Sequence, residues 1–100
     1  MARFDVHSMR DKDAVYVVDV QSDLLSDLAT RAVIPLIPVD VGPKPIGDLN
    51  PAYEVHGKRY VLLTQAIASV PRTELKRTIA SFAEHRDSIT RALDTLFIGF

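Results

Sequence analysis

The sequence predicts a mainly β fold of the α+β class, with strands along the first two-thirds of the chain and one helix at its C-terminal end. Segments rich in β-branched residues alternate between apolar and polar positions. Clusters of glycine and proline separate these segments, and the last apolar residues recur at helical spacing instead. A chain of 100 residues can bury one modest core, so we expect a single domain over residues 1–100.

The N-terminal part is expected to form a hairpin with a loose loop. Residues 3–7 alternate, with Phe4 and Val6 on one face. A charged connection over residues 8–13 leads to a second strand over residues 14–20, which is rich in β-branched side chains.

The next strand, residues 30–39, contains Pro35 and Pro38. Because proline cannot donate a hydrogen bond to a ladder, the two prolines predict an edge strand or a bulge. Just before this strand, Leu24 and Leu25 form an apolar pair in a polar turn region. They are expected either to be stranded in solvent or to plug the end of a barrel.

A long surface loop and a tight hairpin follow. The glycines and prolines of residues 40–51 exclude regular structure and predict a loop. His56-Gly57 separates strands over residues 52–55 and 58–64, and the glycine supplies the positive φ angle of the turn. Residues 72–80 fit both a strand alternation and a helical spacing, and we favour the strand.

The final helix is expected over about residues 82–97 and begins with a capping box formed by Ser81 and Glu84. One face carries an apolar stripe that should pack on the core: Ile89, Ala92, Leu93, Leu96, Phe97 and Phe100. Ile98 lies off this stripe, on the same side as Asp94, which should face water. A carboxylate at position 94 also opposes the negative end of the helix dipole. These two residues indicate either a protein contact surface or a terminal turn that frays.

The composition excludes several classes of function. A net charge of −1 gives no electrostatic case for binding nucleic acid or a membrane surface. Without cysteine the chain has no disulfide, thiolate zinc site or thiol nucleophile. The first residues lack a signal-peptide pattern, and no run reaches the ~18 apolar residues of a membrane span. We therefore expect a cytoplasmic protein.

No catalytic residue, metal site or cofactor is predicted. His7, His56 and His85 are scattered, without the spacing of a metal site or of a histidine–carboxylate pair, and each is expected at the surface. The serines and glycines form neither a nucleophile elbow nor a phosphate cradle. The sequence therefore favours a binding protein over an enzyme.

Five short segments follow one another along nearly the whole chain. They are Asp19-Val20-Gln21-Ser22-Asp23, Arg31-Ala32-Val33-Ile34-Pro35-Leu36, Ala68-Ser69-Val70-Pro71, His85-Arg86 and Leu96-Phe97-Ile98-Gly99-Phe100. In this order and at these separations, the sequence resembles the CcdB-type toxins of bacterial type II toxin–antitoxin modules. The resemblance implies a homodimer of chains that each combine an SH3-like barrel, a small accessory sheet and a C-terminal α-helix.

The resemblance also implies a function. Toxins of this family poison DNA gyrase, because the dimer binds the gyrase A subunit in its cleaved-DNA state and traps the complex without chemistry of its own. A CcdA-like antitoxin removes the toxin with a disordered C-terminal segment, and the family is associated with plasmid maintenance and transcription autoregulation. The gyrase-contacting positions of the family match the following residues: Ser22, Leu24, Leu25, Asp94, Ile98, Gly99 and Phe100.

Two expectations concern the partners. An exposed apolar segment at residues 97–100 should be covered by a second copy, which gives a homodimer. The antitoxin segment should contact the connection His7 to Lys12 and the loop Asp40 to Pro51.

The chain departs from the family at two of these positions. Ile98 stands where the family commonly has a tryptophan that stacks on an arginine of gyrase, so that cation–π contact is lost. Asp94 stands where the family often has asparagine, and its carboxylate could pair with the same arginine. Two alternatives follow: a CcdB-like protein with a lost or altered target, or an mRNA endoribonuclease toxin on the same barrel.

Overall fold

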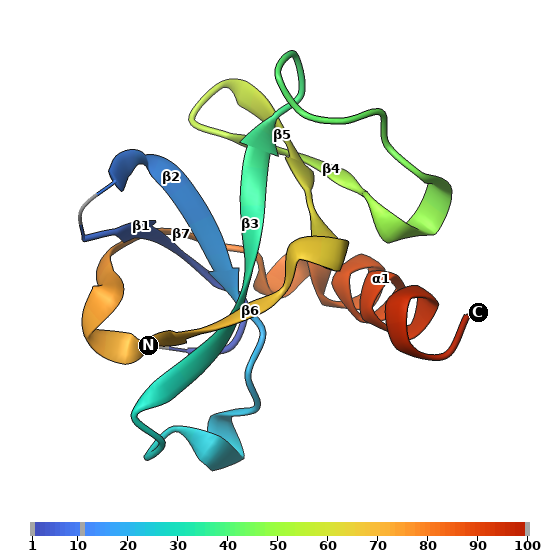
Figure 1. Ribbon diagram of the computed structural model, residues 1–100. Coiled ribbons are helices and arrows are strands. Elements are labelled where there is room, and N and C mark those ends of the chain that lie inside the picture. Colours follow the sequence, from blue (N-terminus) through green and yellow to red (C-terminus); the bar gives the residue numbers. More distant parts are fainter. Residues whose placement is uncertain (1, 11, 100) are drawn as a thin grey trace.

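The computed structural model describes residues 2–10 and 12–99, without the side chains of residues 12–14. Strands dominate this part of the chain, and one α-helix ends it (Figure 1). The elements are β1 (Asp5–Met9), β2 (Lys12–Asp19), β3 (Thr30–Pro38), β4 (Ala52–Val55), β5 (Lys58–Leu62), β6 (Ala68–Pro71), β7 (Leu75–Ser81) and α1 (Arg86–Phe97). The predicted mainly β class with a C-terminal helix is confirmed.

The strands form one antiparallel sheet in the order β4-β5-β3-β2-β1-β7, with β6 paired to β3. Strands β7, β1, β2, β3 and β6 curl into a half-barrel, and the β4-β5 hairpin extends the far half of β3 (Figure 1). This arrangement matches an SH3-like barrel with a small accessory sheet.

Strand β3 is central, so the expectation of an edge strand was wrong. On one side it pairs with β2; on the other it pairs first with β6, up to Val33, and then with β5, from Leu36 onward. Pro35 sits in the gap between β6 and β5, and its carbonyl accepts from Leu63 N at 3.0 Å on that side. The N–H and C=O groups of one strand residue point to the same neighbouring strand. The N–H group that Pro35 lacks would therefore point to the place where the partner of β3 changes from β6 to β5.

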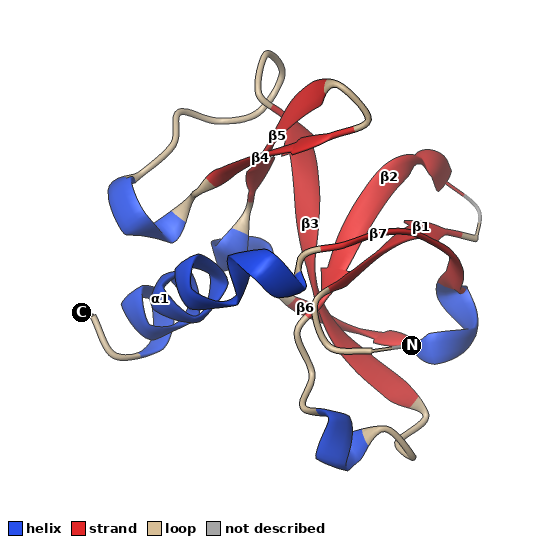
Figure 2. Ribbon diagram, turned by 180° about the vertical axis from the view of Figure 1, so that it is seen from behind, coloured by secondary structure: helices blue, strands red, loops and turns tan. Residues whose placement is uncertain are grey.

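Two apolar clusters occupy opposite faces of the sheet. The larger cluster lies between the sheet and α1, and includes Phe82, Ile89 and Ala92 from the helical end. Figure 2 shows α1 lying against the sheet, with its C-terminal end projecting away from the strands. The smaller cluster, centred on Val17, Val33 and Leu75, lies inside the half-barrel. Successive residues of a strand point to opposite faces, which is how β2 and β3 supply both clusters.

The local predictions have mixed outcomes. The His56-Gly57 turn joins β4 to β5 with φ angles of 50° and 80°, as predicted. Strand β7 confirms the strand interpretation for residues 75–80, but Arg72–Glu74 form a 3-10 turn, so the strand predicted from residue 72 was wrong over its first three residues. The connection expected over residues 8–13 is shorter, because β1 continues to Met9 and β2 begins at Lys12. The loop of residues 40–51 contains one 3-10 turn, Gly47–Leu49, where regular structure was not expected.

Helix α1 begins later than predicted, at Arg86, after a 3-10 turn over Ala83–His85. Ser81 Oγ accepts from Ala83 N at 3.3 Å, but the N-cap residue of this turn is Phe82, which makes no side-chain cap hydrogen bond. The expected capping box of Ser81 with Glu84 is therefore not formed by the described hydrogen bonds. The apolar stripe is buried or half-buried at Ile89, Ala92, Leu93 and Leu96, but Phe97 is 70% exposed. The stripe therefore leaves the core at Phe97, the first residue of the apolar segment 97–100 that was expected to be exposed.

Candidate functional site

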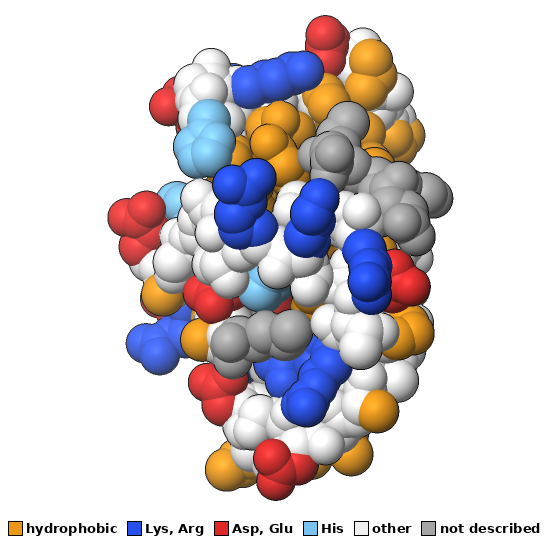
Figure 3. Space-filling view, turned by 90° about the vertical axis from the view of Figure 1, so that its left-hand side faces the viewer, with side chains coloured by type: hydrophobic (Ala, Val, Ile, Leu, Met, Phe, Trp, Pro, Cys, Tyr) orange, Lys and Arg blue, Asp and Glu red, His pale blue; other side chains and the backbone are white. Residues whose placement is uncertain are grey.

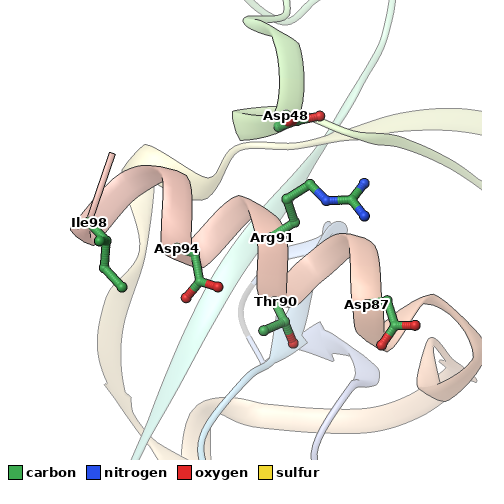
Figure 4. A pocket seen from close by; sticks show the side chains of 6 residues that line it. All are labelled: Asp48, Asp87, Thr90, Arg91, Asp94 and Ile98. Atoms are coloured by element: carbon green, nitrogen blue, oxygen red, sulfur yellow. The ribbon is translucent and has the colours of Figure 1, made fainter. Parts of the chain in front are cut away.

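A shallow pocket of about 450 Å³ runs along the exposed side of α1. Its lining, here called the helix-end pocket, consists of Asp48, Asp87, Thr90, Arg91, Asp94 and Ile98. Thr90, Asp94 and Ile98 follow one another along one side of the helix, and Asp48 approaches from a different segment (Figure 4). Spacings of four residues place such side chains on one helix face.

The helix-end pocket combines charge with apolar surface. Three carboxylates, those of Asp48, Asp87 and Asp94, surround one guanidinium, that of Arg91. No ion pair joins Arg91 to these carboxylates in the described part of the chain, so the charges are available to a partner. Ile98 is 62% exposed, which confirms the prediction that it lies off the core stripe.

Gly99 ends the helix. Its φ angle is 91°, a conformation that side chains with a Cβ rarely adopt, and the N–H groups of Ile98 and Gly99 both donate to Asp94 O, at 2.7 and 3.0 Å. This arrangement turns the chain away from the helix directly after Ile98. Gly99 therefore has a structural role in addition to the contact that its position predicts.

A second pocket of about 440 Å³ lies at the other end of α1. Its lining, here called the turn pocket, consists of Arg3, Phe4, Ser22, Asp23, Leu24, Ala83 and Arg86. Ser22 Oγ accepts from Leu24 N at 3.2 Å, and this bond starts the 3-10 turn Asp23–Leu25. Leu24 is 94% exposed and Leu25 is 49% exposed, which excludes the barrel-plug interpretation of this pair.

The predicted site residues thus fall into two groups. Ser22 and Leu24 line the turn pocket, with Leu25 in the same turn, whereas Asp94 and Ile98 line the helix-end pocket. The two pockets share no lining residue. Phe100 lies outside the described residues.

Comparison with known proteins identifies the family. The family model of the CcdB protein matches residues 3–99. The chain belongs to the CcdB family. This membership places it among the toxins of toxin–antitoxin modules.

A solved structure supports the fold of this CcdB-family chain. The Mycobacterium tuberculosis toxin MazF-mt6 is similar, with a TM-score of 0.76 and 16% sequence identity, over 94% of this chain and 96% of that chain. At this identity the likeness concerns the fold alone.

Several lining residues of the two pockets were not predicted from the sequence. Asp87, Thr90 and Arg91 could have been found from helical spacing to Asp94 and Ile98. Asp48 could not, because it comes from the long loop and reaches the helix only through tertiary packing. Arg3 and Arg86 meet in the turn pocket from opposite ends of the sequence, and no local signal joins them.

The histidines of the CcdB-family chain differ in their surroundings. His56 is exposed in its turn, as expected. His85 is half-buried and stacks on Tyr53, with ring centroids 4.5 Å apart. His7 is 1% exposed, so its expected surface position was wrong. The strand position alone did not reveal that its face is the inside of the half-barrel.

Nothing in the described residues 2–10 and 12–99 gathers three or more His, Asp or Glu side chains in a geometry that could hold a metal ion. Lys and Arg side chains on the barrel side of the molecule are spread among uncharged and acidic ones (Figure 3). Among the residues that the structure describes, no helix is long and apolar enough to span a bilayer.

Proposed function

We propose that this chain is a toxin that traps DNA gyrase through the A subunit, by binding and without catalysis. The contact surface would consist of Ser22, Leu24, Leu25, Asp94, Ile98, Gly99 and Phe100. One observation carries the proposal: Leu24 and Ile98, at positions where the family contacts its target, are large apolar side chains that are 94% and 62% exposed. Exposed apolar groups beside charged ones are typical of protein interfaces.

We further propose that the active form is a homodimer. Phe97 and Ile98 leave apolar surface uncovered at the end of α1, and a second copy would cover part of it. A dimer would also present both groups of predicted residues to one large target, although they line separate pockets within one chain.

The replacement of the family tryptophan by Ile98 changes the chemistry proposed for the contact. Ile98 offers apolar area without a π face, so it cannot stack on a cation. Asp94 lines the same pocket and can accept hydrogen bonds from a guanidinium. Recognition of a gyrase arginine would therefore depend on a carboxylate where the family uses an indole.

The proposed antitoxin contact lies mainly on the long loop. Val41 and Ile46 are exposed there and Val39 is exposed directly before it, and a disordered CcdA-like segment could bury these side chains as it wraps the toxin in the cytoplasm. The other expected contact, His7 to Lys12, needs correction, because His7 and Ser8 are buried in β1. Of the described residues in that stretch, Arg10 is exposed and Met9 is half-buried.

A matched pair of leucines tests the gyrase proposal. Leu25 and Leu28 are exposed to nearly the same extent, 49% and 48%, but only Leu25 belongs to the proposed surface. Leu25→Ser should weaken the inhibition of supercoiling by purified gyrase and the accumulation of cleaved DNA, whereas Leu28→Ser should leave both unchanged.

Equal effects of the two variants would contradict the proposed surface. Absence of any gyrase inhibition by the unmodified chain would favour a CcdB-like protein with another target. An RNA-cleavage assay run beside the gyrase assay tests the third function, because only an endoribonuclease toxin would degrade the RNA.

A further inference from the structure

His7 is a buried polar side chain inside the half-barrel. It lies on β1 between Val17 of β2 and Thr78 of β7. Its Nδ1 lies 3.3 Å from Thr78 Oγ1, while its Nε2 is the buried side-chain atom that has no hydrogen-bond partner among the described residues. An imidazole in such a place is tolerated in its neutral form, since a buried unpaired charge costs far more than a buried unpaired polar group.

The buried carboxylate of Asp19 is already occupied by other hydrogen-bond donors and is poorly placed to accept one from a protonated His7. Asp19 Oδ2 already accepts from Arg31 Nε and Nη2, and Asp19 Oδ1 accepts from Gln21 N at 3.0 Å. A proton on His7 would therefore add a second positive charge that Arg31 disfavours, while Asp19 is already paired with Arg31.

The charged groups around His7 act in both directions. Burial is the largest influence and lowers the pKa of His7; Asp5 on β1 and Asp19 on β2 raise it, and the amino-terminal charge and Arg31 on β3 lower it. From β7, the neutral Thr78 faces the ring. The net effect is a lowered pKa, which means that the folded chain disfavours the protonated ring.

The pairing of β1 with β7 is the edge pairing beside His7. Strand β7 ends the described sheet and pairs only with β1, whereas β2 is held by both β1 and β3. The β1-β7 register also shifts on both sides of His7, between Val6 and His7 and between His7 and Met9. Strain at this position should therefore be released by opening the edge strand.

We propose that protonation of His7 opens the pairing of β1 with β7, so that this edge strand is an acid-sensitive latch. The device is independent of the gyrase proposal. Strand β7 leads through Phe82, whose N–H donates to Phe4 O at 2.8 Å, into α1. Opening the latch loosens the attachment of the helix that carries Asp94 and Ile98.

The lowered pKa of His7 determines how the stability of the β1-β7 pairing depends on pH. Because folding lowers the pKa of His7 below the ordinary value of 6.5, the closed pairing is fully stable above that value. It loses stability as the pH falls from there towards the folded-state pKa, since the open form binds the proton more tightly.

Hydrogen exchange of the full chain tests the latch between about pH 8 and about pH 5, the range in which histidines titrate. After correction for intrinsic exchange rates, the amides of β7 should show a several-fold loss of protection at the acid end, with a smaller loss in β2. His7→Asn should remove this difference. The control His56→Asn should keep it, because His56 is exposed and asparagine tolerates its positive φ angle.

A second measurement needs no variant. In an NMR titration of the unmodified chain, the His7 ring should titrate below pH 6.5, the ordinary value for histidine. The proposal is overturned if β7 protection does not change across the pH range, if the loss persists in a folded His7→Asn variant, or if the His7 ring titrates at or above pH 6.5.

Discussion

Arg31 donates two hydrogen bonds to a single oxygen of Asp19, from Nε at 3.0 Å and from Nη2 at 2.6 Å, and both side chains are buried. The pair joins β2 to β3 within the half-barrel. Removing one partner leaves the other charge buried and unpaired, which typically costs 3–5 kcal/mol.

Asp19→Asn should therefore lower the free energy of unfolding by about 3–5 kcal/mol in urea denaturation. The exposed Asp27 provides the control, because Asp27→Asn should change the free energy of unfolding by no more than about 0.5 kcal/mol. The double variant Asp19→Leu, Arg31→Met should lose less unfolding free energy than its two single variants lose together. A single variant as stable as the control would show that the pair is dispensable.

Ile98→Trp should strengthen gyrase trapping by about tenfold, which corresponds to ~1.4 kcal/mol, because the indole restores a π face for a cation. The free energy of unfolding should stay within about 0.5 kcal/mol, since Ile98 is exposed. Val41→Trp, at a position that is 72% exposed on the long loop, controls for added aromatic surface. Equal increases in gyrase trapping by Ile98→Trp and Val41→Trp, or no increase by Ile98→Trp, would argue against the helix end as the target surface.

Ile89→Ala and Phe97→Ala should differ sharply, although helical spacing puts both residues on one stripe. Ile89 is fully buried, so its truncation should cost about 2–5 kcal/mol of unfolding free energy. Phe97→Ala should cost less than about 1 kcal/mol in the monomer and should weaken self-association instead. Thermal unfolding and sedimentation measure the two effects. A large destabilisation by Phe97→Ala at low concentration would place that ring in the core.

Gly99→Ala should weaken gyrase trapping without changing global stability. A Cβ at Gly99 meets no atom within 4 Å, so the cost of about 1–2 kcal/mol comes from the positive φ angle alone. The last helical turn can release that strain by fraying, which displaces Ile98. Gly99→Asn should act more weakly, because asparagine tolerates this conformation better. If both variants trap gyrase as well as the parent chain, the orientation of the helix end does not matter.

The sequence predicts the elements whose signals are local. The turn at His56-Gly57 and the stripe from Ile89 to Leu96 need only a short window, and both are confirmed. The prolines of β3 show the limit of such rules. Proline excludes a donor, but the fact that β6 gives way to β5 beside Pro35 is a property of the whole sheet.

The candidate site likewise contains residues that local spacing predicts and residues that only the folded chain brings together. Ile98 could be singled out because it departs from the helical stripe. Asp48 could not, since it reaches the helix-end pocket from a loop that has no spacing relation to α1. His7 was misplaced because alternation along β1 does not tell which face of a curled sheet is enclosed.

The pairing of β1 with β7 joins residues 5–9 to residues 75–81. During synthesis, β1 emerges from the ribosome long before its edge partner exists, and the half-barrel stays open until most of the chain has been translated. Helix α1 follows β7 after one short 3-10 turn, so the exposed surface of its last turn is completed soon afterwards. A prematurely terminated chain would thus lack both the closed barrel and the helix, and translation itself would delay the appearance of a competent toxin.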